Sequence, residues 1–79
     1  MKICVLERGW VAVGQLERDG DEYILVNGSI IRRWGTSEGL GELAMKGPLP
    51  ETKLDKVPLM KFHKNQLIFT LSCDEQKWK

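Results

Sequence analysis

Residues 10–26, WVAVGQLERDGDEYILV, decide the fold that we expect for this chain. The pair Asp19-Gly20 separates two runs of strand-forming residues, and an Asp-Gly pair tolerates the positive φ angles of a tight primed turn. This segment therefore predicts an antiparallel β-hairpin. Its first strand is apolar on both faces at residues 11–13 and amphipathic towards the turn, because neighbouring side chains of a strand point to opposite sides. Gly14 predicts a bend or a bulge within that strand.

The segment after this hairpin has two interpretations. Asn27-Gly28 is a second turn-forming pair, and the strand-like run SIIRRW follows it at residues 29–34. The pair either forms another hairpin or lies within one long strand that bends at Gly28. The second interpretation gives a strongly curved sheet, which is how a small barrel closes.

Short strands are also expected near both ends of the chain. Residues 3–6 predict the first strand, and residues 59–62 and 66–73 predict the last two, with a turn at residues 63–65. The final strand has the clearest alternation in the sequence. Four of its side chains face one way, namely Leu67, Phe69, Leu71 and Cys73. We therefore expect this strand to lie in the core.

Residues 35–47 have a different character. Thr36 or Ser37 can cap a helix, apolar side chains recur at helical spacing, and Gly47-Pro48 is a usual helix stop. We expect a helix of two turns that starts near Gly39. Three prolines follow within residues 48–58, which predicts a loop there, since proline donates no backbone hydrogen bond to a sheet.

These elements predict a mainly β fold, a small, strongly bent antiparallel barrel of the SH3-like or Sm-like kind with one short helix. The alternative is an open α+β sheet with the helix laid across one face. At 79 residues the chain forms a single domain, residues 1–79. It has no apolar run that approaches the length of a membrane span, so no membrane partner is expected.

The charges and cysteines suggest a compartment and limit the class of partner. A net charge of +1 gives no electrostatic argument for nucleic acid from the chain as a whole, but residues 31–66 carry seven basic and four acidic side chains, a net +3. The first residues lack the apolar segment of a secretion signal. Cys4 and Cys73 are therefore expected to be reduced in a cytoplasmic protein.

No constellation of residues in the sequence indicates catalysis. His63 is the single histidine and lies in an expected turn, without a nucleophile or an orienting carboxylate nearby in sequence. Glu38 and Glu42 would share a helix face, which is usual for surface glutamates near the start of a helix. Neither cysteine has a second metal ligand close in sequence. We therefore expect no enzyme, no metal and no cofactor.

The glycine-rich stretch before the expected helix is the candidate ligand site. Its backbone N–H groups could converge on an anion, with two arginines immediately upstream as charged donors and a tryptophan as a stacking platform. The candidate residues are Arg32, Arg33, Trp34, Gly35, Thr36, Ser37, Gly39 and Gly41. The spacing matches neither a Walker loop nor a dinucleotide fingerprint. The alternative is a glycine-rich turn that packs Leu40 and Leu43 onto the barrel.

Tryptophan is frequent for a chain of this size. Trp10 and Trp34 adjoin glycines, so they either cover an end of the barrel or stack on a ligand. Trp78 lies in a charged tail, and we expect it to pack against a neighbouring subunit.

Residues 33–48, RWGTSEGLGELAMKGP, and TKLD at residues 52–55 resemble the central segment of short uncharacterised proteins of bacteriophages and prophages. This resemblance implies a viral protein that acts in the cytoplasm of a bacterial host, and it implies no activity. A looser resemblance is to Sm-like proteins, carried by VGQL at residues 13–16, YILVN at residues 23–27 and LIF at residues 67–69. It implies ring assembly. Residues 62–65, FHKN, depart from the signature of Sm-like RNA binders, so uridine binding is not carried over.

The sequence thus supports two hypotheses of function. In the first, the chain is a homo-oligomeric, non-enzymatic protein that binds an anionic ligand, a nucleotide signal or nucleic acid, and so could counter a host defence. In the second, it is an inhibitor or a virion assembly factor that meets a protein through the surface of residues 34–48. Binding to a phosphate should weaken steeply with ionic strength, whereas an apolar protein interface should not.

Overall fold

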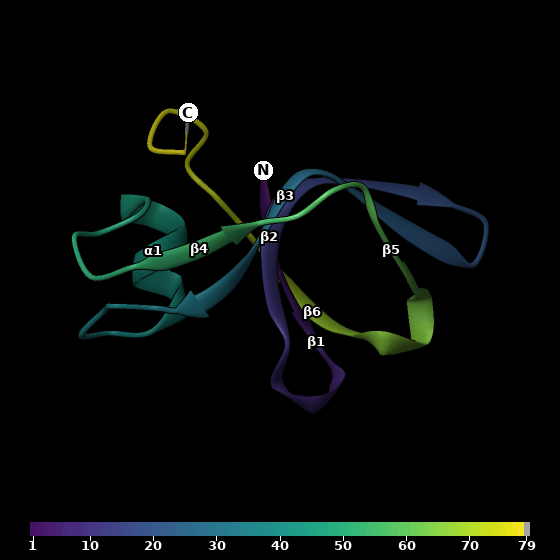
Figure 1. Ribbon diagram of the computed structural model, residues 1–79, viewed down its shortest axis with the longest axis horizontal. Helices are drawn as coiled ribbons and strands as arrows, with labels where there is room; N and C mark the ends of the chain where they lie inside the picture. The colour runs from purple at the N-terminus through teal and green to yellow at the C-terminus, as the bar shows by residue number, and fades with distance from the viewer. Residues whose placement is uncertain (79) are drawn as a thin grey trace.

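The computed structural model describes residues 1–78 and confirms a mainly β fold with one short helix (Figure 1). Six antiparallel strands form one sheet. The elements in chain order are β1 (Lys2–Leu6), β2 (Val11–Asp19), β3 (Glu22–Arg33), α1 (Leu40–Lys46), β4 (Lys53–Lys56), β5 (Met60–His63) and β6 (Leu67–Ser72).

The long strand β3 organises the sheet. Along one edge it pairs with β2, and along the other edge it pairs with β5 through its first half and with β4 through its second half. The full path runs β4-β3-β2-β1-β6, with β5 beside β3. No pairing joins β5 to β6 among residues 1–78, so the sheet stays open and the closed barrel is not confirmed.

Asn27-Gly28 lies within β3, so the interpretation of one long bent strand is the correct one. The register of β2 against β3 shifts between Val13 and Gln15, which confirms the irregularity expected at Gly14. The two strands approach closely there. A Cβ atom on Gly14 would lie 2.8 Å from Leu25 Cγ and 2.9 Å from Gly28 Cα. Glycine is therefore needed for the close crossing that bends the sheet.

The bent sheet buries two separate apolar clusters, one on each face. Side chains of β1 and β2 alternate between them: Ile3 and Val13 belong to the first cluster, and Cys4 and Ala12 belong to the second. Helix α1 covers the first cluster, whereas β5 and the curled start of β3 cover the second. Figure 1 shows α1 and β5 on opposite sides of the central strands.

The expectation that residues 48–58 form only a loop is wrong for residues 53–56. They form β4, which pairs with the second half of β3. The prolines do not prevent this, because Pro50 and Pro58 lie outside the strand and β4 lies at the edge of the sheet. An edge strand needs backbone donors on one side only.

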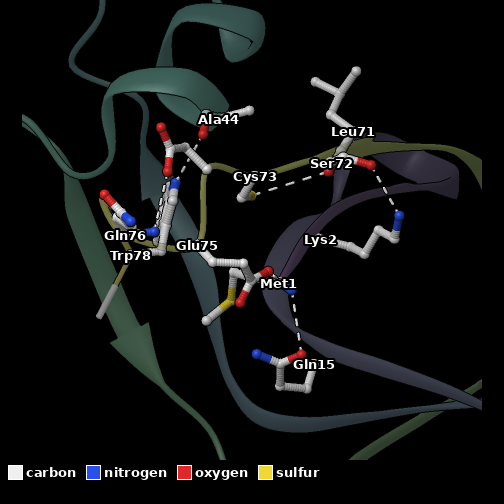
Figure 2. Close-up of polar contacts among 11 residues, drawn as sticks. Met1, Lys2, Gln15, Ala44, Leu71, Ser72, Cys73, Glu75, Gln76 and Trp78 are labelled. Carbon is white, nitrogen blue, oxygen red and sulfur yellow. Dashed lines mark hydrogen bonds and ion pairs between the residues drawn. The ribbon is translucent and has the colours of Figure 1, made fainter.

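Trp78 does not need a neighbouring subunit to be buried, and this expectation is wrong. Its indole packs in the first cluster of its own chain and is only 9% exposed. The indole N–H donates to the carbonyl of Ala44 at 3.1 Å (Figure 2). The amide of Asp74 donates to the same carbonyl at 3.0 Å. The charged tail is therefore fixed against α1.

The expectation that β6 lies in the core holds in part, because Leu67, Leu71 and Cys73 pack against the buried clusters, whereas Phe69 does not. Strand β6 is an edge strand, and Ile68 and Phe69 are 61% and 49% exposed. A register shift against β1 between Val5 and Leu6 interrupts the alternation. Leu67 therefore packs in the second cluster, while Leu71 packs in the first. Sequence alternation alone cannot reveal such a bulge, because the extra residue is defined by the partner strand.

Candidate functional site

The two arginines of the sequence-predicted site lie at the end of β3 in different environments. Arg32 is exposed and its Nε is 2.9 Å from Oδ2 and 3.2 Å from Oδ1 of Asp55 on β4. Arg33 is also exposed, and its register partner is Lys53. Arg32 is thus neutralised locally, while Arg33 lies opposite another cation.

The glycine-rich turn does gather backbone N–H groups around an anion, and this anion is the chain's own Glu42. The amides of Ser37 and Glu38 donate to Glu42 Oε1 at 3.0 and 2.9 Å. Lys46 Nζ lies 3.2 Å from the other carboxylate oxygen. The hydrogen bond from the Glu38 amide and that from Lys46 are the main causes that lower the pKa of Glu42. The carboxylate of Glu42 therefore occupies the position that the sequence suggested for a ligand.

The other predicted residues shape this turn and the start of α1. Thr36 Oγ1 accepts the amide of Gly39 at 3.1 Å, and Gly39 is the N-cap residue of α1. Gly35 has a φ of +67° and lies against the backbone of Glu51, where a side chain would collide. Gly41 lies in α1 with open space around it.

Trp34 is the member of the predicted set with a large exposed apolar surface, since its side chain is 42% exposed. Its carbonyl accepts a hydrogen bond of 2.7 Å from Thr52 Oγ1. The turn is therefore tied to the loop before β4, and the indole of Trp34 stays available at the surface.

A groove of about 410 Å³ lies elsewhere, beside the open part of the sheet where β5 faces the end of β1. Buried or half-buried apolar side chains line it, namely Leu6, Ile30, Met60 and Phe62. Its exposed lining residues are Glu7, Arg8, Trp10, Lys61 and Gln66. None of the eight residues predicted from the sequence lines this groove. Its size is within the range of small-molecule sites.

Two cations line the groove without an acidic partner. In the described part of the chain the ion pairs involve neither Arg8 nor Lys61. Arg8 also has a φ of 64° in the tight turn Glu7–Gly9, a left-handed conformation that is costly for a residue with a Cβ atom. A strained cation at a groove is a reason to suspect function.

Aromatic residues form much of the apolar surface around the groove. Trp10 is 56% exposed, whereas Phe62 is buried. Phe62 stacks on Tyr23 with 5.7 Å between ring centroids, and Arg18 lies 5.6 Å from the centroid of the Tyr23 ring. Phe62 therefore both lines the groove and packs against the ring of Tyr23.

Sequence reasoning singled out Trp10 but did not connect it with Arg8, Lys61 and Gln66. The available signal was Arg8 itself, a residue with a Cβ atom directly before Gly9, where glycine or asparagine would suit a left-handed turn better. The pairing of β5 with β3 brings Lys61 to the groove, and this pairing joins residues far apart in sequence.

The two thiols are poor nucleophiles near neutral pH. Burial, together with the charge of Cys73, raises the pKa of Cys4 to about 11, and burial also raises the pKa of Cys73. The thiolate is the reactive form, and a raised pKa makes it scarce. Residues 1–78 contain no cluster of three or more His, Cys, Asp or Glu side chains arranged for a metal ion.

Comparison with protein family models, curated proteins and solved structures finds no match to this chain. In the part of the chain that the structure describes, no helix has the length and apolar character needed to cross a membrane. The functional argument therefore depends on the chemistry of the groove.

Proposed function

We propose that this chain is a non-enzymatic binding protein that holds an anionic ligand with a flat aromatic group, such as a nucleotide, in the groove beside Trp10. The observation that carries the proposal is Arg8, a cation without an acidic partner in the described chain and held at a φ of 64° where the groove begins.

The apolar part of the groove suits an aromatic ring. The indole of Trp10 is 56% exposed, so one ring face can accept a stacked base, and the buried Phe62 provides an apolar inner wall. Stacking of a base on an aromatic side chain contributes about 1–3 kcal/mol and tolerates any base.

The polar part of the groove suits a phosphate and a base edge. Arg8 and Lys61 can donate to phosphate oxygens, and such charge-assisted hydrogen bonds are stronger than neutral ones. Gln66 Oε1 accepts the amide of His63 at 2.9 Å, which leaves its side-chain N–H groups for a ligand. Glu7 is the acidic residue of the lining, so it favours a ligand with an N–H donor away from its phosphate.

The resemblance to bacteriophage proteins supports a biological setting for this chemistry. A small protein that binds a nucleotide without changing it could sequester a host defence signal in the bacterial cytoplasm. Sequestration needs a stable complex and no catalytic group.

Calorimetric titration with adenosine monophosphate, adenosine and inorganic phosphate tests the proposal. We expect the monophosphate to bind most tightly and its affinity to fall with added salt. Trp10→Ala should weaken binding roughly tenfold or more, and Lys61→Ala should weaken it and flatten the salt dependence. Arg32→Ala is the matched control, because Arg32 is an exposed cation outside the groove.

The proposal is wrong if none of the three probes binds, or if Trp10→Ala leaves the affinity unchanged. A loss of binding in Arg33→Ala, with the groove variants unaffected, would instead place the site at the glycine-rich turn. Native mass spectrometry of the protein purified from bacterial cytoplasm, followed by denaturation, would identify any phosphate-bearing molecule that it carries.

A second candidate function is binding to a protein through the surface of residues 34–48. It is favoured by two exposed apolar side chains on that surface, Trp34 at 42% and Met45 at 66%. Large exposed aromatic and methionine side chains are typical of interface centres. A pull-down from bacterial lysate with wild type and Trp34→Ala tests this function, and equal capture by both proteins would reject it.

A further inference from the structure

Strand β6 is an unprotected edge of the sheet, in contrast to the other two edges. Edge strands are usually short or carry charges or prolines, which prevent pairing with another chain. Strands β4 (KLDK) and β5 (MKFH) have four residues each and carry lysines. Strand β6 (LIFTLS) has six residues and no charge. Its side chains Ile68 and Phe69 are 61% and 49% exposed.

The backbone of β6 offers hydrogen-bonding groups on its outer side. The amide of Cys73 donates to the carbonyl of Met1 at 3.0 Å, just beyond the register pair Lys2 and Ser72. Because hydrogen-bonded pairs alternate along an antiparallel ladder, the N–H and C=O groups of Leu71 and Phe69 point towards β1. Those of Thr70 and Ser72 point away from β1, where the described chain provides no partner strand.

We infer that β6 pairs in antiparallel fashion with β6 of a second copy of this chain, with Thr70 opposite Thr70 of that copy. A two-fold axis through the Thr70 pair, perpendicular to the sheet, makes the contact self-complementary and closed. The outward-pointing groups of the two Thr70 residues then exchange two hydrogen bonds.

The side-chain pattern of β6 fits this register. Leu71 and Phe69 lie on the same face as their β1 partners Ile3 and Val5, which is the face that α1 covers. In the dimer Phe69 of each copy lies opposite Leu71 of the other. The half-exposed ring of Phe69 is thereby covered by an apolar side chain, a favourable type of cross-strand pair.

A second copy fits better than a charged partner because β6 offers no charge that could select one. The dimer joins two sheets into one and removes the exposed edge from both chains. The groove beside Trp10 is not part of this contact, so ligand binding and dimerisation are separate properties.

Sedimentation equilibrium of the full chain over a range of concentrations tests the inference. We expect the wild type to reach twice the mass of one 9.0 kDa chain. Thr70→Pro removes an outward-facing N–H, which an edge strand tolerates, and it should raise the dimer Kd roughly tenfold or more. Ile68→Lys should raise the Kd as well, because charged residues on an edge oppose pairing.

Leu59→Lys is the matched control, since Leu59 is 59% exposed and lies outside β6. It should leave the Kd unchanged. Circular dichroism tests whether each variant is folded. If one β6 variant does not fold, the other one is used for the comparison. A wild type that stays monomeric at all concentrations overturns the inference and leaves β6 as an edge for an extended segment of another protein. A dimer that neither β6 variant weakens also overturns it.

Discussion

Replacing Arg8 with glycine should make the fold more stable and the ligand complex weaker. Arg8 has a φ of 64°, and a left-handed conformation costs an L-residue about 1–2 kcal/mol. Glycine removes this cost but loses about 0.5–1 kcal/mol more conformational entropy on folding. The net gain is about 1 kcal/mol, which corresponds to a rise in Tm of roughly 4–8 °C for a domain of this size.

The same substitution removes a guanidinium from the groove. If Arg8 contacts a phosphate, the loss of one charge-assisted hydrogen bond should weaken adenosine monophosphate binding about tenfold. Urea unfolding and calorimetric titration of the same protein samples measure both effects. Arg8→Ala separates them, because alanine removes the charge and keeps the Cβ atom, so affinity should fall without a gain in stability.

Two results would contradict this reasoning. If Arg8→Gly lowers the free energy of unfolding, then the arginine side chain makes contacts that stabilise the fold, and the strain has a structural explanation. If Arg8→Gly raises stability and leaves the affinity unchanged, then the strain is real and Arg8 is not a ligand-binding residue.

Three further predictions follow from the packing and the charges. Trp78→Ala should lower the free energy of unfolding by about 3–5 kcal/mol at every protein concentration, and a concentration-dependent loss in urea unfolding would point to burial between subunits instead. Gly14→Ala should cost about 1–3 kcal/mol in the same assay, because its Cβ would lie 2.9 Å from the backbone at Gly28, and an unchanged midpoint would reject the close crossing. A hydrogen bond from the Glu38 amide is the largest cause that lowers the pKa of Glu42, and one from the N-terminal amine is the largest cause that lowers the pKa of Glu75. Both carboxylates therefore stabilise the fold at pH values above the pKa that they have in the unfolded chain. Tm should therefore fall as the pH drops through their lowered pKa values, and Glu42→Gln should reduce that dependence.

Local features of the sequence predicted the helix and every strand except β4. Asp19-Gly20 marked the hairpin, although the two-residue turn in the structure is Gly20-Asp21 and Gly20 is the residue that adopts a positive φ. Gly39 and Gly47 bracketed α1 at the positions where the structure places its caps. Each of these signals lies within a few residues of the structure that it specifies.

Features that depend on distant partners could not be predicted in this way. The bulge that redirects Leu67 is defined by β1, at the other end of the chain. The burial of Trp78 requires the carbonyl of Ala44 on α1. The same holds for the ligand site predicted from the sequence. The glycine-rich composition predicted that backbone amides of this turn bind an anion. That Glu42 of the same chain is this anion depends on the path of the turn into the helix, which the sequence does not reveal.

The open part of the sheet connects the two proposals. A barrel closed by pairing of β5 with β6 would cover the edge of β6, but these strands do not pair in the described chain. Two features that are unfavourable in an isolated chain lie beside this opening: the positive φ of Arg8 and the uncharged edge strand β6. A glycine at position 8 would relieve the backbone strain, and a lysine on β6 would protect the strand from pairing with another chain, both at little structural cost. Both features cost the isolated fold stability, and binding gives each of them a physical explanation: a ligand for Arg8 and a second chain for β6.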